Sequence, residues 1–139
     1  MVQNAKNLLS ISSSSINAIG GKFSLENLEL LNTLSMPSLR SVNEIALINL
    51  QQLNTVAFAS SGVTKASKIQ VSDTFLGEFT GFNLSTVDFL QIDNNPKMTS
   101  LMVDLVNITD SLIVIKNGNN MAIDMPSLEG AAEIQLSNI

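Results

Sequence analysis

The strongest constraint on the fold is a short repeat in which two apolar residues, each followed by one residue of any kind, precede Asn or Asp. Successive Asn or Asp positions are separated by 23, 22, 24, 21, 23 and 21 residues. Apolar residues that alternate with a period of two predict a short strand with one buried face. After a shortened first copy that ends at Asn4, these positions are Asn27, Asn49, Asp73, Asn94, Asn117 and Asn138.

A second apolar pattern follows each predicted strand. Apolar residues recur about four, seven and nine positions after the Asn, as in Leu31, Leu34 and Met36. This pattern predicts an extended limb that returns over the same core. One such unit cannot bury its own apolar face, but stacked units cover one another. Parallel crossovers are right-handed. We therefore expect one mainly β domain over residues 1–139, a right-handed parallel β-solenoid of about six rungs of 21–24 residues.

The recurring Asn stands where the chain leaves each strand. An amide both donates and accepts hydrogen bonds, so stacked Asn side chains can satisfy the turn backbone and one another. Asp73 should break this series, because a carboxylate only accepts. We interpret the series as a structural Asn/Asp ladder. The alternative is a buried ligand site.

The composition excludes several classes of function. The chain has no His, Cys, Trp or Tyr, so Ser–His–Asp and Cys–His nucleophile systems and zinc sites of the Cys/His kind cannot be assembled. Seven scattered basic residues stand against twelve acidic ones, so we expect no nucleic-acid partner. No apolar run approaches the roughly 18 residues of a membrane span. We expect no transmembrane segment, no cofactor, no metal and no catalytic residue.

The outward face of the predicted sheet is small and polar. Gln70, Gln91, Asp93 and Lys116 are its candidate ligand-binding residues, and Asp93 is expected to pair with Lys116 on the next rung. Stacked Gln side chains suit the hydroxyl groups of a sugar. The alternative is that the same side chains form a ladder of amides that are hydrogen-bonded to solvent. A β-helix enzyme acting on polysaccharides would need a cluster of carboxylates on one face or a calcium site, and the acidic residues of this face do not stack. Asp88 and Asp110 lie in similar places before consecutive strands, and we interpret them as polar turn residues.

Two N-glycosylation sequons are present, at Asn83-Leu84-Ser85 and Asn107-Ile108-Thr109. Leu84 and Ile108 fit the inward positions of the repeat, so we expect Asn83 and Asn107 to point outward. If the chain is secreted, both are candidate glycosylation sites.

Three segments carry a resemblance to a known family. The chain resembles the leucine-rich-repeat-like receptor L domain and, more narrowly, the fungal Ecm33/Sps2 family of GPI-anchored cell-wall proteins. The segments are 19–25, with its Gly-Gly strand start, 81–98, with its Asn-Asn-Pro turn, and 125–131, whose Met-Pro-Ser-Leu also occurs at 36–39. The resemblance implies a secreted, glycosylated, lipid-anchored protein outside the cell that supports organisation of the fungal cell wall. Wall polysaccharide or surface proteins are its expected partners, and no catalytic residue is implied.

The chain departs from that family at its ends. It has no signal-peptide pattern, no Ser/Thr-rich tail with an anchor signal and no Cys, and both ends fall within a strand copy. Natural solenoids normally cap such open edges. We therefore expect a fragment of a longer solenoid, a truncated gene product, or self-association in which a second copy covers the ends.

Overall fold

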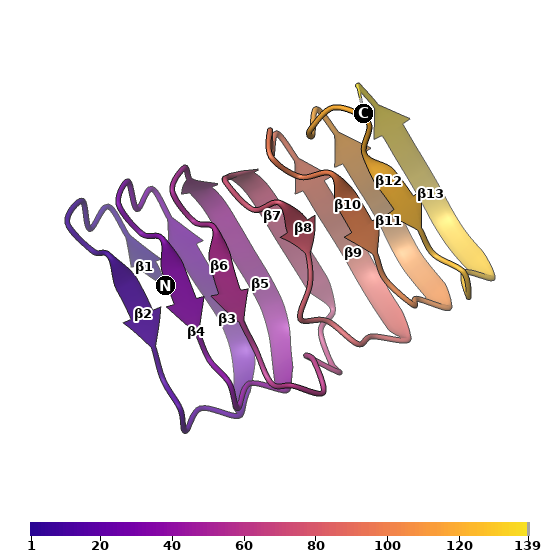
Figure 1. Cartoon of the computed structure of the whole chain (residues 1–139). Helices are drawn as coiled ribbons and strands as arrows, with labels where there is room; N and C mark the ends of the chain where they lie inside the picture. Colours follow the sequence, from indigo (N-terminus) through magenta and orange to yellow (C-terminus); the bar gives the residue numbers. More distant parts are fainter. Residues whose placement is uncertain (139) are drawn as a thin grey trace.

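One long parallel sheet runs through the whole molecule. The computed structural model describes residues 1–138, and the elements within that range are all strands. The odd-numbered strands form a seven-stranded parallel sheet whose spatial order follows the sequence (Figure 1). They are β1 (Val2–Gln3), β3 (Ala18–Glu26), β5 (Ser41–Leu50), β7 (Lys68–Thr74), β9 (Thr86–Asp93), β11 (Asn107–Ile115) and β13 (Gly130–Ser137).

The even-numbered strands are short and form a second layer over this sheet, here called the return layer (Figure 1). It consists of two three-stranded parallel sheets. The first contains β2 (Ser10–Ser12), β4 (Thr33–Ser35) and β6 (Thr55–Ala57), and the second contains β8 (Glu78–Phe79), β10 (Ser100–Met102) and β12 (Ala122–Asp124). Each coil thus supplies one strand to each layer. This arrangement confirms the predicted all-β parallel solenoid of about six coils.

The core lies between the two layers and is almost wholly aliphatic. In β5, Ile45 and Leu47 point inward and are 1% and 2% exposed. From the return limbs, Leu31, Leu34 and Met36 meet such residues and are 2% exposed or less. The two apolar patterns of the repeat are therefore the two walls of one core, as the periodicity predicts.

A residue with left-handed backbone lies within one position of the end of each strand of the long sheet. The φ angles of these residues lie between 52° and 57°. Side chains with a Cβ rarely adopt this conformation, and Asn and Asp tolerate it best. This requirement explains why the repeat ends in Asn or Asp. The left-handed residues are Asn4, Asn27, Asn49, Asp73, Asn94, Lys116 and Asn138.

The predicted register is wrong in one coil, by one residue. Leu112 pairs with Leu90 and Val114 with Ile92, so Lys116 takes the turn position that we expected for Asn117. Residues 112–115 are all apolar, so the alternating pattern fits either register, and the extra residue of β11 at Thr109–Asp110 brings Leu112, and not Ile113, beside Leu90. With the corrected register, the left-handed residues are spaced by 23, 22, 24, 21, 22 and 22 residues.

The return layer is interrupted between β6 and β8. No Cα atom of β6 lies within 8 Å of a Cα atom of β8, whereas paired strands lie about 4.8 Å apart. The coil from Asn49 to Asp73 is the longest, at 24 residues, and the next coil is the shortest, at 21. The two neighbouring return limbs therefore run out of step, and the layer separates there (Figure 1).

Lys116→Asn should stabilise the protein. Asn adopts the left-handed region more readily than Lys, so we expect the free energy of unfolding to rise by about 1 kcal/mol. Chemical denaturation followed by circular dichroism measures the change. The matched control is Lys65→Asn, at an exposed Lys whose φ is not positive. A Lys116→Asn protein no more stable than the control would contradict the conformational explanation.

Candidate functional site

The left-handed Asn and Asp residues form a ladder along one edge of the solenoid. Asn27 donates from Nδ2 to Oδ1 of Asn4 at 3.3 Å, and Asn49 donates to Oδ1 of Asn27 at 2.8 Å. Asn94 donates in the same direction to Oδ1 of Asp73. Each amide thus donates to the residue one coil earlier, which links stacked turns side chain to side chain.

The ladder is broken at Asp73. In this direction Asp73 would have to donate to Asn49, and a carboxylate has no proton to donate. Oδ1 of Asn49 instead accepts a hydrogen bond from Nε2 of Gln51, a residue of its own turn, at 3.2 Å. The sequence predicts this break, and the structure shows how the vacant acceptor is satisfied.

A second ladder lies inside the solenoid, one position after the first, and the sequence patterns did not predict it. Asn95 is fully buried. Its Oδ1 accepts from the backbone N–H of Thr74 at 2.9 Å and from the Thr74 hydroxyl at 2.6 Å. Its Nδ2 donates to the carbonyl of Val71 at 3.0 Å and to Oδ1 of Asn117 at 3.1 Å. Asn117 thus belongs to this inner ladder, where its Nδ2 donates to the carbonyl of Ile92 at 2.8 Å.

The inner ladder is a structural feature. Both polar atoms of the Asn95 side chain already have two protein partners each, so the amide offers no free group to a ligand. In earlier coils the same position holds Leu28 and Leu50, which are fully buried. In the sequence, the consecutive pair Asn94-Asn95 was the available signal for this inner ladder.

Three of the four candidate face residues come together on the long sheet. Gln70, Gln91 and Asp93 are half-buried on its outer side. The Ser72 hydroxyl donates to Oδ1 of Asp93, and Nε2 of Gln91 donates to the same oxygen at 2.9 Å. Nε2 of Gln70 lies 3.4 Å from the Ser72 hydroxyl. The four side chains form one connected polar network, in which the hydrogen bonds to Asp93 converge on one carboxylate oxygen.

Lys116 does not belong to this face, which corrects the prediction. Because of the register shift, Ile115 lies beside Asp93, and Lys116 lies beside Asn94 in the turn. The expected pair between Asp93 and Lys116 is therefore not formed. At this coil the outer face carries Ile113 and Ile115, both half-buried, in place of Val114 and Lys116. A slip of one residue exchanges the two faces of a strand, because its side chains alternate.

Both sequon asparagines are exposed, and the residues that follow them are buried. Leu84 and Ile108 are each 2% exposed, as predicted. Asn107 begins β11 and lies beside Gly130 of the next coil. A Cβ atom at Gly130 would lie 2.7 Å from Oδ1 of Asn107, so the glycine leaves space for that side chain. The geometry is compatible with glycosylation at both positions.

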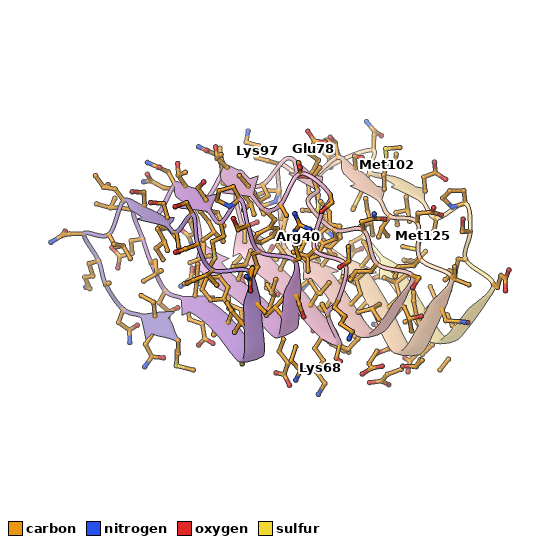
Figure 2. The ribbon with its side chains drawn as sticks, turned by 90° about the horizontal axis from the view of Figure 1, so that it is seen from below. Arg40, Lys68, Glu78, Lys97, Met102 and Met125 are labelled. Carbon is orange, nitrogen blue, oxygen red and sulfur yellow. The ribbon has the colours of Figure 1, made fainter. Side chains whose placement is uncertain are left out.

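A cleft of about 330 Å³ opens at the interruption of the return layer. Its floor is apolar and reaches the inward side chains of the long sheet, Leu47 and Val71. Polar groups of Asn54, Glu78 and Thr80 lie at its rim. Figure 2 shows Glu78 on the return layer, on the side of the solenoid opposite Lys68 of the long sheet.

Three phenylalanines pack together beside this cleft. Phe79 and Phe82 are stacked with their ring centroids 4.6 Å apart, and Phe58 meets Phe82 edge-on at 5.4 Å. Phe58 and Phe79 are buried, whereas Phe82 is partly exposed. The repeat patterns did not predict the cleft. The unequal coil lengths on either side of Asp73, and the concentration of aromatic residues at 58–82 in a chain with six Phe, were the available signals.

The charged groups do not assemble into a metal site within the part of the chain that the structure describes. No group of three acidic side chains suited to a metal ion occurs among residues 1–138. Lys6 and Glu29 form an exposed ion pair at 3.9 Å. No helix among the described residues is long and apolar enough to span a membrane.

Similar proteins cover the chain from end to end. Protein ecm33 of Aspergillus fumigatus is 31% identical over 134 residues, which is 96% of this chain and 33% of that protein. The cell wall mannoprotein PST1 of Saccharomyces cerevisiae is 34% identical over 98% of this chain and 30% of its own length. The cell surface GPI-anchored protein ECM33 of Candida albicans is 26% identical over 99% of this chain and 34% of its own.

These matches define the class of protein to which the chain is related. The fold is a parallel β-solenoid, and the relatives are fungal cell-wall and cell-surface proteins. The resemblance to the Ecm33/Sps2 family is thereby confirmed, and the names of the relatives agree with the predicted extracellular localisation. The chain spans about a third of the length of the curated relatives it matches. No family model and no solved structure matches it.

Asp73→Asn should join the two parts of the Asn/Asp ladder, which is broken at this residue. An amide at this position can accept from Asn94 and also donate to Asn49, so we expect the free energy of unfolding to rise by about 1 kcal/mol. Equilibrium denaturation in urea provides the measurement. Asp104→Asn, at an exposed Asp outside both ladders, is the matched control. Equal free energies of unfolding for the two variants would show that the missing hydrogen bond between residues 49 and 73 does not lower the stability of the protein.

Proposed function

We propose that this chain is a non-enzymatic part of a fungal cell-wall protein that lies on the outer surface of the cell and supports the organisation and integrity of the wall. The observation that carries the proposal is the match to cell-wall and cell-surface proteins over 96–99% of the chain. Lipid anchoring at the cell surface would be a property of the whole protein of which this solenoid forms a part.

The chemistry of the described residues supports a structural role. A catalytic site for wall polysaccharides would need two carboxylates roughly 5–9.5 Å apart on one face. On the outer face of the long sheet, Glu26 and Asp93 stand three coils apart, which is roughly 14 Å at the spacing of paired strands. Asp88 of β9 and Asp110 of β11 occupy similar positions in adjacent coils, where Oδ1 of Asp88 accepts a hydrogen bond from the Thr109 hydroxyl at 2.6 Å, so we interpret them as structural polar residues within the strands. The stacked turns and the aliphatic core instead build one continuous rod, which suits a scaffold within or on the wall.

A receptor-like role is the second candidate, favoured by the polar network on the long sheet. Gln70, Gln91 and Asp93 present amide and carboxylate oxygens side by side on one surface. Such acceptors suit the hydroxyl groups of a glycan. A binding screen against wall glycans separates the two candidates. Saturable binding that is lost on combining Gln91→Ala with Asp93→Ala would favour the receptor role.

Loss of the gene that encodes this chain should weaken the cell wall. We expect growth of the deletion strain to be hypersensitive to Congo red and calcofluor white, and the intact gene to restore it. A gene carrying Leu34→Asp should fail to restore growth, because Leu34 is fully buried and a carboxylate there unfolds its coil. Leu30→Asp, at a leucine that is 36% exposed, is the matched control and should restore it. A deletion strain with normal tolerance to both dyes would overturn the wall role.

Both sequons should carry glycans when the protein is secreted. We expect the intact mass of protein from a fungal host to exceed the mass of the polypeptide and to fall stepwise in Asn83→Gln and Asn107→Gln. Digestion with a glycosidase that removes N-linked glycans is the control and should bring all variants to the polypeptide mass. An unmodified mass for the secreted wild-type protein would disprove this use of the sequons.

A further inference from the structure

The interruption of the return layer leaves two sheet edges facing each other. β6 is the last strand of one three-stranded sheet, and β8 is the first strand of the other. Their Cα atoms are more than 8 Å apart. Two strands that flank a third stand about 9.6 Å apart, twice the spacing of paired strands. The separation is therefore greater than direct pairing allows, and one cleft borders both strands, lined by Val56 on one side and by Glu78 and Phe79 on the other.

The opening is a bounded window. At one end the two coils are paired in the long sheet, where Leu50 lies beside Thr74. At the other end they pair again, where Val63 bridges to Phe82. Only the stretch between these points is open, and β6 has three residues there. The window therefore has room for a short extended segment of about three residues.

Backbone groups of both edges point into the window. The N–H of Thr55 and the carbonyl of Ala57 are bonded to the neighbouring coil on the far side of β6. In a parallel strand, alternate residues direct their backbone groups to opposite neighbours. The N–H and carbonyl of Val56 therefore point toward β8. The Gly77 carbonyl accepts a hydrogen bond from the N–H of Thr99 and therefore points toward β10. By the same alternation, the N–H and carbonyl of Glu78 point toward β6.

The side-chain environment specifies what an added strand would carry. The cleft under the window has an apolar floor that includes Leu47, Val56 and Val71, so the central side chain of the segment would be apolar. Glu78 is exposed at the rim, and no described basic side chain forms an ion pair with it. Opposite charges on adjacent strands attract. A basic residue beside the central apolar residue would therefore complement this rim.

We propose that the window between β6 and β8 is a strand-addition site. Its occupant is a short extended segment of a partner protein, with an apolar residue at its centre and a basic residue beside it. The segment would pair with both sheet edges at once and make the return layer continuous. The site does not depend on the wall role, because the two unpaired edges, the apolar floor and the exposed Glu78 define it.

The test uses a synthetic peptide that copies residues 31–37, which form a return strand elsewhere in the chain, with Lys in place of Thr33 and Ser35. We expect saturable binding, measured by nuclear magnetic resonance on the whole labelled chain. Hydrogen exchange at the Val56 and Glu78 amides should slow on binding. The Thr55 amide is already bonded to Asn32, so its exchange should hardly change. No saturable binding, or binding without added protection at Val56 and Glu78, would overturn the proposal.

Two controls separate strand addition from other kinds of binding. The same peptide N-methylated at two consecutive central amides keeps its side chains but cannot pair with both edges, so its binding should be lost. Laminarihexaose, a β-1,3-glucan fragment, should leave the Val56 and Glu78 amides unprotected. Equal binding of the methylated peptide would indicate apolar capture alone. Protection by the glucan in place of the peptide would assign the cleft to a glycan. Either result would refute a strand-addition site.

A pair of charge variants locates the binding. Glu78→Lys should weaken binding of the Lys-containing peptide about fivefold, because an attraction across adjacent strands becomes a repulsion. Glu129→Lys, at another exposed acidic residue, is the matched control and should leave the affinity unchanged. Circular dichroism checks that both variants are folded. Equal affinities of the two variants would place the peptide elsewhere.

Discussion

Stacking of coil on coil through parallel backbone pairing is the interaction on which the rest of this structure depends. No coil covers its own apolar face, so Leu34 or Leu47 is buried only because coils lie above and below it. Pairing at constant register requires every long strand to end at the same level. A single left-handed residue makes that turn in each coil. The restriction of this backbone conformation to a few residue types then produces the Asn and Asp series.

The solenoid changes character at Asp73, where several features coincide. The Asn/Asp ladder is broken there, because the Asp73 carboxylate has no proton to donate to Asn49. The inner position that follows each turn residue changes from the buried leucines of earlier coils to Thr74, Asn95 and the partly buried Asn117. The return layer separates at the same coil, because the longest coil is followed by the shortest. A solenoid tolerates such a change, since each coil contacts only its neighbours. The cleft is therefore confined to one junction and leaves the long sheet continuous.

The sequence alone predicted the period, the strands, the two apolar walls and the outward position of Asn83 and Asn107. It failed at β11 for a physical reason. Residues 112–115 are all apolar, so either register satisfies an alternating pattern, and the Asn at 117 favoured the wrong one. The structure selects Leu112 and Val114 as the inward pair and accepts Lys116 at a left-handed turn. Alternation specifies register only where one set of side chains is polar.

What the sequence by itself determined is the repeating part of the molecule: a parallel β-solenoid with an aliphatic core and Asn-type turns, related to fungal cell-wall proteins. These features follow from local patterns that recur in every coil, so each copy supports the others. Only the tertiary structure decided which Asn residues share a ladder, that Lys116 lies in a turn, and that β6 and β8 face each other unpaired. Those features depend on how coils of unequal length are aligned, and alignment between coils is set by long-range pairing that no single repeat contains.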